Sequence, residues 1–247
     1  MRCLQLLVVC FFAALPRAAA FYTHRHLPRN SGFSPGISRS ADALYANVVI
    51  TGSAGGVGYA YAEQFLAGGH SVVISDIVNV EAAVASLKKK FPSGNVYGTT
   101  CDVSDVPSVE ALGAFAQEKL STVSHWINNA GINGGRRALS TVPMAEVQKV
   151  VTVNLLGIIY STKVAMDIMS KQPGGGHIFN TVGSGVKGGG TPGYACYGAT
   201  KRGIPQFTKS LVEEVEKGVQ GYEKEKALGR CIVHNLSPGM VFTQVSD

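Results

Sequence analysis

The sequence predicts one α/β domain, a parallel sheet with helices on both faces, over residues 45–247. Short β-branched apolar runs alternate with longer amphipathic patterns, which is typical of strand–helix–strand units in a parallel sheet. A glycine cluster directly follows the first apolar run, where the first helix should begin. The 30 glycines and 15% charged residues are typical of an α/β protein with many tight turns. These observations together predict a doubly wound sheet of the Rossmann type.

Strands and helices are expected in strict alternation. The expected strands are short apolar runs, as in strands buried on both faces, over Asn47–Thr51, Ser71–Ser75, Val96–Cys101, Trp126–Asn129, His177–Thr181 and Cys231–Asn235. The expected helices follow the 3.6-residue period over Ala60–Leu66, Val80–Phe91, Val106–Leu120, Met144–Ser170 and Tyr194–Lys217. Residues 218–229 are expected to form a solvated excursion before the last strand.

The first 44 residues are typical of a targeting segment. Residues 1–20 combine Arg2, an apolar run over Leu4–Leu15 and a small-residue site at Ala18–Ala20, which predicts a signal peptide. Residues 21–44 are rich in Arg and Ser and nearly free of acids, which predicts a transit-like segment. This two-part arrangement resembles the presequences of algae with multi-membrane plastids and predicts plastid localisation. A signal anchor, or the secretory pathway and endoplasmic reticulum, is the alternative.

The distribution of charge and cysteine excludes several kinds of partner. Five arginines and one acid lie before residue 46, so most of the net charge of +6 belongs to the targeting segment and no nucleic-acid partner is expected. The cysteines beyond that segment are Cys101, Cys196 and Cys231, an odd number without a C-x-x-C pair. Because of this odd number, no disulfide framework is expected. The histidines are scattered along the sequence, so no metal site is expected either.

The glycine-rich stretch Thr51–Gly58 lies between the first strand and the first helix, where a dinucleotide-binding loop belongs. Glycine lets the backbone approach a pyrophosphate, and the helix N-terminus supplies N–H groups and positive dipole. Asp76 follows the second strand, 24 residues after Gly52, where a carboxylate could accept hydrogen bonds from the adenosine ribose. A solvated acid at a strand end is the alternative for Asp76.

Tyr197 and Lys201 lie four residues apart on a predicted helix, so both side chains share one face. A neighbouring ammonium group favours the phenolate and lowers the pKa of a tyrosine, which suits proton donation to a carbonyl oxygen. Ser184 lies 13 residues before Tyr197 and could meet its hydroxyl, or could be an ordinary loop serine. Asn154, inside an apolar helical stretch, has either a functional or a structural role.

These residues are similar to the short-chain dehydrogenase/reductase family over 47–243. The order TGxxxGxG, an acid after the second strand, NNAG at Asn128–Gly131, the helix Asn154, Ser184 with YxxxK, and PGxVxT at 238–243 carries the resemblance. The family implies that Tyr197 is the acid/base, that Lys201 lowers its pKa and holds the nicotinamide ribose, that Ser184 bonds the substrate carbonyl, and that Asn154 organises a water relay to Lys201.

The same resemblance implies a set of cofactor contacts for NADH or NADPH. The implied positions comprise the pyrophosphate loop, the adenosine half and the nicotinamide frame, namely Gly52, Ser53, Gly56, Gly58, Asp76, Asp102, Asn129, Ala130, Gly131, Tyr197, Lys201, Pro238, Gly239 and Thr243. Asp76 and the absence of a basic residue in the glycine loop predict a preference for NADH.

Several segments resemble the chlorophyll(ide) b reductases of that family: Trp126–Asn133, Ala165–Ser170, Gly175–Asn180 and Ser237–Val241. The resemblance implies reduction of the 7-formyl group of chlorophyll(ide) b to a hydroxymethyl group in chlorophyll b breakdown. It also implies a homodimer or tetramer and peripheral contact with thylakoids. The alternatives are a reductase of another hydrophobic carbonyl (3-oxoacyl, steroid or retinal-type) and a catalytically silent nucleotide-sensing protein.

The sequence ends four residues after Thr243, at Asp247. Members of the family continue through a substrate-covering loop, another helix and a last strand. We therefore expect this domain to lack the last helix and strand.

Overall fold

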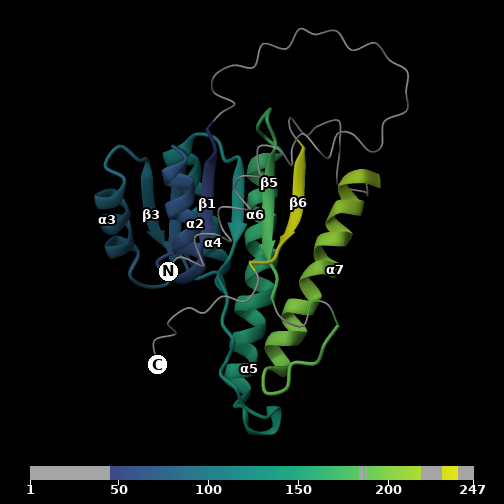
Figure 1. Ribbon diagram of the computed structural model, residues 1–247. Helices are drawn as coiled ribbons and strands as arrows, with labels where there is room; N and C mark the ends of the chain where they lie inside the picture. Colours follow the sequence, from purple (N-terminus) through teal and green to yellow (C-terminus); the bar gives the residue numbers. More distant parts are fainter. Residues whose placement is uncertain (1–44, 184–185, 187, 218–229, 239–247) are drawn as a thin grey trace. The chain divides into compact units, whose positions relative to one another are not determined.

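The computed structural model describes residues 45–183, 186, 188–217 and 230–238 (Figure 1). The expectations for the two targeting segments, for Ser184, Gly239 and Thr243, and for the excursion over 218–229 lie outside the described residues.

A six-stranded parallel sheet forms the centre of the domain, in the order β3-β2-β1-β4-β5-β6. The strands are β1 (Asn47–Thr51), β2 (Ser71–Asp76), β3 (Val96–Thr100), β4 (His125–Asn128), β5 (Gly176–Thr181) and β6 (Cys231–Leu236). The order reverses between β1 and β4, where a cleft for a ligand is expected at the carboxyl edge of such a sheet. The predicted doubly wound α/β fold is confirmed.

Helices cover both faces of this sheet. The helical elements are α2 (Gly56–Ala67), α3 (Val80–Lys90), α4 (Val106–Leu120), η3 (Leu139–Thr141), α5 (Met144–Val151), η4 (Thr152–Leu156), α6 (Gly157–Met169) and α7 (Ala195–Lys217). Buried residues of α4 and α6 pack with Val49, Trp126 and Ile178 in the main core cluster. Phe65 of α2 meets His125 on the opposite face, because neighbouring side chains in a strand point to opposite sides.

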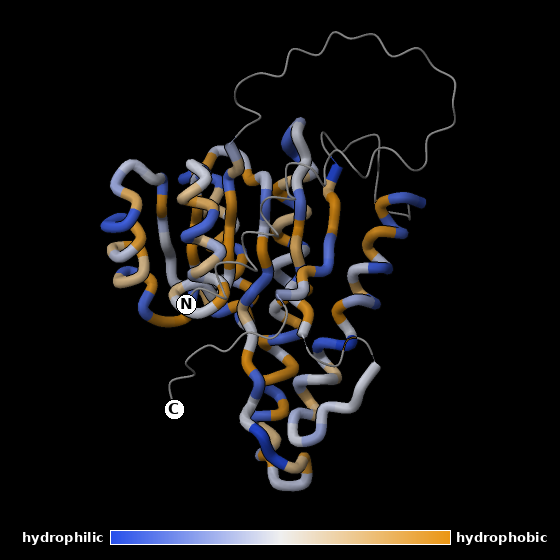
Figure 2. The backbone as a smooth tube through the Cα atoms, in the orientation of Figure 1, coloured by the Kyte–Doolittle hydropathy of each residue, from blue (hydrophilic) through white to orange (hydrophobic). Residues whose placement is uncertain are grey.

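The chain forms one long helical rod from α5 through η4 to α6, which Figure 1 shows extending beyond the carboxyl edge of the sheet. The sequence predicts an uninterrupted α-helix here, but residues Thr152–Leu156 form a π-helix. The rod is apolar, and Ile158, Ala165 and Met169 on one side are buried. In Figure 2 the hydrophobic residues of the strands lie between helices whose outer sides are hydrophilic.

Other differences from the expected elements are small. Helix α2 begins at Gly56, four residues before the expected start at Ala60, because two glycines in its first turn hide the helical pattern. The short 3₁₀ turn at Leu139–Thr141 was not expected. The remaining boundaries agree with the sequence within one or two residues.

Candidate active site

The glycine loop between β1 and α2 packs tightly against the end of β4. Gly52 has a left-handed φ of 62°, and a Cβ there would lie 2.6 Å from the Ala130 Cα. A Cβ on Gly58 would lie 2.4 Å from the Gly52 carbonyl oxygen. Both positions therefore require glycine for steric reasons.

Asn129 and Ala130 hold this loop in place. The Asn129 amide donates to the carbonyl oxygens of Thr51 and Gly52, at 3.1 and 2.8 Å. The backbone N–H groups of Asn129 and Ala130 both donate to the Thr51 hydroxyl. Asn129 and Ala130, which we expected near the adenosine, thus also hold the glycine loop in place.

Ser53 is fully buried within the loop. Its hydroxyl donates to the carbonyl oxygen of Ile50 at 2.7 Å, and its backbone N–H donates to that of Ser75 at 3.0 Å. Neither donor of Ser53 faces the open side of the loop. Ser53 therefore helps to hold the shape of the loop, and its expected contact with a pyrophosphate stays a prediction.

Gly55 and Gly56, which follow in the loop, leave space and free N–H donors for a phosphate. A Cβ on Gly55 would meet nothing within 4 Å, so the loop is open there. Helix α2 begins at Gly56 with no side-chain cap and no acid in its first turn. Free N–H groups at such a helix start attract an anion. This arrangement fits the pyrophosphate of a dinucleotide.

Two carboxylates lie at the ends of the neighbouring strands. Asp76 ends β2, and its carboxylate accepts from the backbone N–H groups of Ala54 and Ile77, at 3.1 and 2.8 Å. Asp102 follows β3 and accepts from the backbone N–H and the hydroxyl of Ser104. Asp76 is thereby fixed beside the glycine loop, where a ribose hydroxyl could reach it.

Tyr197 and Lys201 lie together in the first turns of α7. Lys201 is 4% exposed, its Nζ donates to the Thr181 carbonyl oxygen at 3.0 Å, and it lies 5.9 Å from the centre of the Tyr197 ring. Burial lowers the pKa of Lys201 to about 8. The ammonium form therefore still predominates at neutral pH beside the tyrosine.

Asn154 lies in the π-helical turn and is fully buried. Its side-chain oxygen accepts from the Ile132 N–H at 2.8 Å, and its amide donates to the Ile132 carbonyl oxygen at 2.7 Å and more distantly to Thr200. The amide is thus satisfied, and it joins the β4 loop to the helix that carries Lys201. Single π turns are frequent at functional sites.

Two glycines define the space around these side chains. A Cβ on Gly183 would lie 2.3 Å from the Tyr197 hydroxyl oxygen. A Cβ on Gly131 would lie 3.1 Å from the Asn154 side-chain oxygen and 3.5 Å from Lys201 Nζ. Gly183 was not among the expected site residues, and only its position between Thr181 and Ser184 could have indicated it.

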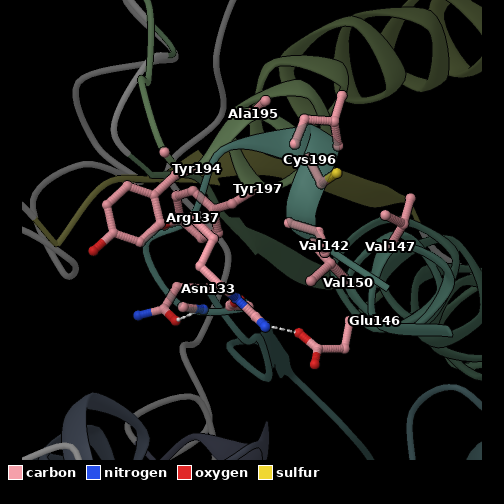
Figure 3. A pocket seen from close by; sticks show the side chains of 14 residues that line it. Asn133, Arg137, Val142, Glu146, Val147, Val150, Tyr194, Ala195, Cys196 and Tyr197 are labelled. Carbon is pink, nitrogen blue, oxygen red and sulfur yellow. Dashed lines mark hydrogen bonds and ion pairs between the residues drawn. The ribbon is translucent and has the colours of Figure 1, made fainter. Parts of the chain in front are cut away.

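A pocket opens beside Tyr197, between the loop after β4, helix α5 and the start of α7 (Figure 3). Arg137 and Glu146 form an ion pair on one side of it, and Tyr194 lies near Tyr197 on the other. Val142, Val147 and Val150 add an apolar wall. Pro238, the described member of the expected nicotinamide frame, follows β6 and is partly buried.

Known proteins resemble this chain over most of the described domain. Chlorophyll(ide) b reductases NOL, chloroplastic, from Oryza sativa subsp. japonica and Arabidopsis thaliana are each 43% identical over 206 residues, which cover 81% of this chain and 57% and 56% of theirs. The chain thus spans little more than half the length of these relatives.

A solved short-chain dehydrogenase/reductase from Burkholderia phymatum in complex with NAD has a TM-score of 0.68 and 27% identity, covering 78% of this chain and 66% of that one. Residues 46–246 match the short chain dehydrogenase family. Because this match covers well over half of the sequence, the chain belongs to the short-chain dehydrogenase family.

Proposed function

We propose that this protein is an NAD(P)H-dependent carbonyl reductase. The observation that carries the proposal is the buried Lys201 ammonium held by Thr181 within 5.9 Å of the Tyr197 ring. When bound, the nicotinamide cofactor supplies a hydride to the carbonyl carbon. Tyr197 donates the proton that the carbonyl oxygen then needs, because the neighbouring ammonium stabilises the phenolate left behind.

The other site residues are proposed to hold the reactants. The start of α2 at Gly56 and the open loop at Gly55 would bind the pyrophosphate, while Gly52 and Gly58 keep the loop in shape. Lys201 would also hold the nicotinamide ribose, and Asn154 would keep a water path open toward it. Ser184 would bond the substrate carbonyl, and Pro238, Gly239 and Thr243 would frame the nicotinamide.

NADH is the proposed preferred cofactor. The Asp76 carboxylate, fixed by the backbone of Ala54 and Ile77, would accept hydrogen bonds from the ribose hydroxyls and repel a 2′-phosphate. Steady-state kinetics with both cofactors tests this, and an efficiency with NADPH more than tenfold above that with NADH would contradict it.

The proposed substrate is chlorophyll(ide) b, whose 7-formyl group would become 7-hydroxymethyl. The support is the 43% identity to two relatives that carry this name. Their names also include the word chloroplastic, and we propose that residues 1–44 direct this protein to the plastid through a signal peptide and a transit-like segment. Cytosolic fluorescence of a fusion of residues 1–44 to a fluorescent protein would contradict that part.

The assembly is proposed to be a homodimer or tetramer formed through α7, which carries Tyr197, and the α5–η4–α6 rod, which carries Asn154, with peripheral contact to thylakoids. Tyr160 and Val164 on α6 are only partly buried, which leaves apolar surface for a second copy. Light scattering after size-exclusion chromatography would show the oligomer, and a purely monomeric mass would contradict it.

The central experiment follows pigments by chromatography after incubation of the full chain with chlorophyllide b and NADH or NADPH. We expect the 7-hydroxymethyl product with the wild type. Tyr197→Phe should lower turnover at least about a thousandfold while cofactor binding persists, because only the proton donor is lost. Failure of the wild type with both cofactors would overturn the proposed substrate.

A further inference from the structure

Two adjacent arginines, Arg136 and Arg137, lie in the loop after β4, and their partners differ; Arg137 lines the pocket. The Arg137 guanidinium forms an ion pair with Glu146 and also lies 3.5 Å from the Gly134 carbonyl oxygen. The Arg137 backbone N–H donates to the Gly193 carbonyl oxygen at 3.0 Å. In contrast, no hydrogen bond or ion pair joins the Arg136 guanidinium to any described residue. Arg137 is thus held in the pocket wall, whereas the Arg136 guanidinium has no polar partner within the described part of the chain.

The side chain of Arg136 packs closely against Gly193, which lines the pocket. A Cβ on Gly193 would lie 2.7 Å from the Arg136 Cγ and 3.5 Å from its Nε. Gly193 also has a φ of 81°, a conformation that favours glycine. The stem of Arg136 therefore lies across a residue that lines the same pocket as Tyr194 and Tyr197. This places a cation beside the pocket rather than on a distant surface.

No acid competes for this cation within the segments that flank the pocket. Residues 131–145 and 188–212 contain no Asp or Glu. Glu146, the acid at the pocket itself, already pairs with Arg137. The same rim carries an apolar wall, so a mainly apolar ligand with one anionic group matches its chemistry.

We propose that Arg136 binds a carboxylate of the substrate and makes this enzyme selective for a free acid over its ester. This inference rests on the proposed function, because chlorophyllide b carries a free propionate where chlorophyll b carries an ester. A guanidinium group offers two parallel N–H donors that match a carboxylate, whereas an ester has no charge to pair with.

The test compares chlorophyllide b with its methyl ester, using NADH and the full chain. We expect the wild type to have a kcat/KM about tenfold higher for the free acid, the size expected for one partly exposed charge-assisted contact. Arg136→Gln should abolish this preference by lowering only the value for the acid. Arg136→Lys should retain part of it, and 0.5 M salt should weaken it in the wild type.

Lys171→Gln is the matched control. Lys171 is exposed just after α6, near the start of β5 and thus toward the amino edge of the sheet, so its loss removes one charge far from Tyr197. We expect it to leave both kcat/KM values unchanged, and thermal unfolding should show that each variant is folded. Equal values for acid and ester in the wild type, or an equal loss for both in Arg136→Gln, would overturn the carboxylate contact.

Failure of the contact and failure of the proposed function give different results. If neither pigment is reduced, the proposed substrate fails, and binding read from the quenching of pigment fluorescence still tests Arg136. Tighter binding of the free acid that Arg136→Gln removes would support the contact. Equal binding of acid and ester would reject it.

Discussion

Lys201, buried beside Tyr197, and His125, half-buried on β4, show that loss of solvent has different consequences in different parts of one sheet. Burial lowers the pKa of Lys201 to about 8 and that of His125 to about 3. At neutral pH Lys201 is still mostly charged, while His125 is neutral. The unperturbed pKa values of the two side chains, rather than the depth of burial, decide this difference.

The groups that contact Lys201 and His125 also differ. Lys201 donates to the Thr181 carbonyl oxygen at 3.0 Å, a contact that an ammonium group can make. His125 instead stacks with His177 and Phe179, at ring-centre distances of 5.5 and 5.9 Å, and His177 in turn lies 3.0 Å from a ring nitrogen of His234. The row of imidazoles formed by His125, His177 and His234 therefore favours neutral rings, whereas the end of the sheet next to Tyr197 accommodates the charge of Lys201.

The largest expected effect is at the charged site. Lys201→Met should lower kcat/KM by about a hundredfold to a thousandfold, because Tyr197 loses the charge that stabilises its phenolate. The free energy of unfolding should change by no more than about 2 kcal/mol, since the cost of burying an ammonium group disappears with the contact to Thr181. Kinetics and urea unfolding measure the two effects. A large loss of stability would show that the lysine is structural.

A smaller catalytic effect is expected at Gly183. Gly183→Ala would place a Cβ 2.3 Å from the Tyr197 hydroxyl oxygen and displace the phenol from Lys201. We expect a loss in kcat/KM of about tenfold to a hundredfold, because small displacements of a catalytic group are costly.

Gly189→Ala is the matched control, because its Cβ would meet nothing within 4 Å. Its kcat/KM should equal that of the wild type. Equal activity of both alanine variants would mean that the position of the phenol does not matter.

Acid should destabilise the protein through the imidazole row. The pKa of His125 is lowered to about 3 and that of His234 to about 4, mainly by burial, so the unfolded chain binds more protons between these values and about 6.5. The stability that depends on neutral histidines is therefore fully present above pH 6.5, and it is lost as the pH falls below 6.5. From pH 6.5 to 4.5 His125 alone should account for about 2 kcal/mol. His125→Phe should flatten this part of the curve from urea unfolding, and an unchanged slope would contradict the assignment.

Raising the pH above 8 should stabilise the folded protein through Lys201. Its folded pKa of about 8 lies below the unfolded value, so the unfolded chain again binds more protons and stability rises with pH above 8. The wild type should gain about 1 kcal/mol relative to Lys201→Met between pH 8 and 9. This difference isolates the lysine, because the buried thiols Cys101 and Cys231, whose pKa is raised to about 11, are present in both proteins. Parallel curves for the two proteins would contradict the lowered pKa.

Much of the fold could be predicted because its signals are local. Helix α4 has the predicted ends at Val106 and Leu120, since an Asp105 cap begins it and the apolar period continues through it. The π turn around Asn154 could not be predicted, because the apolar pattern there is the same as in an α-helix, and the partner of the Asn154 side chain, Ile132, is 22 residues away. Gly183 was missed because it matters only through the lack of a side chain, which leaves space for the Tyr197 hydroxyl on helix α7.

The sequence by itself determined the strand–helix alternation, the glycine loop and the spacing of Tyr197 from Lys201, because each depends on residues within a few positions of one another. Only the tertiary structure decided that Ser53 turns inward, that Asn129 supports the loop, and that Lys201 is buried yet charged while the half-buried His125 is neutral. These properties depend on desolvation and on partners from distant segments, and only the folded sheet brings those segments together.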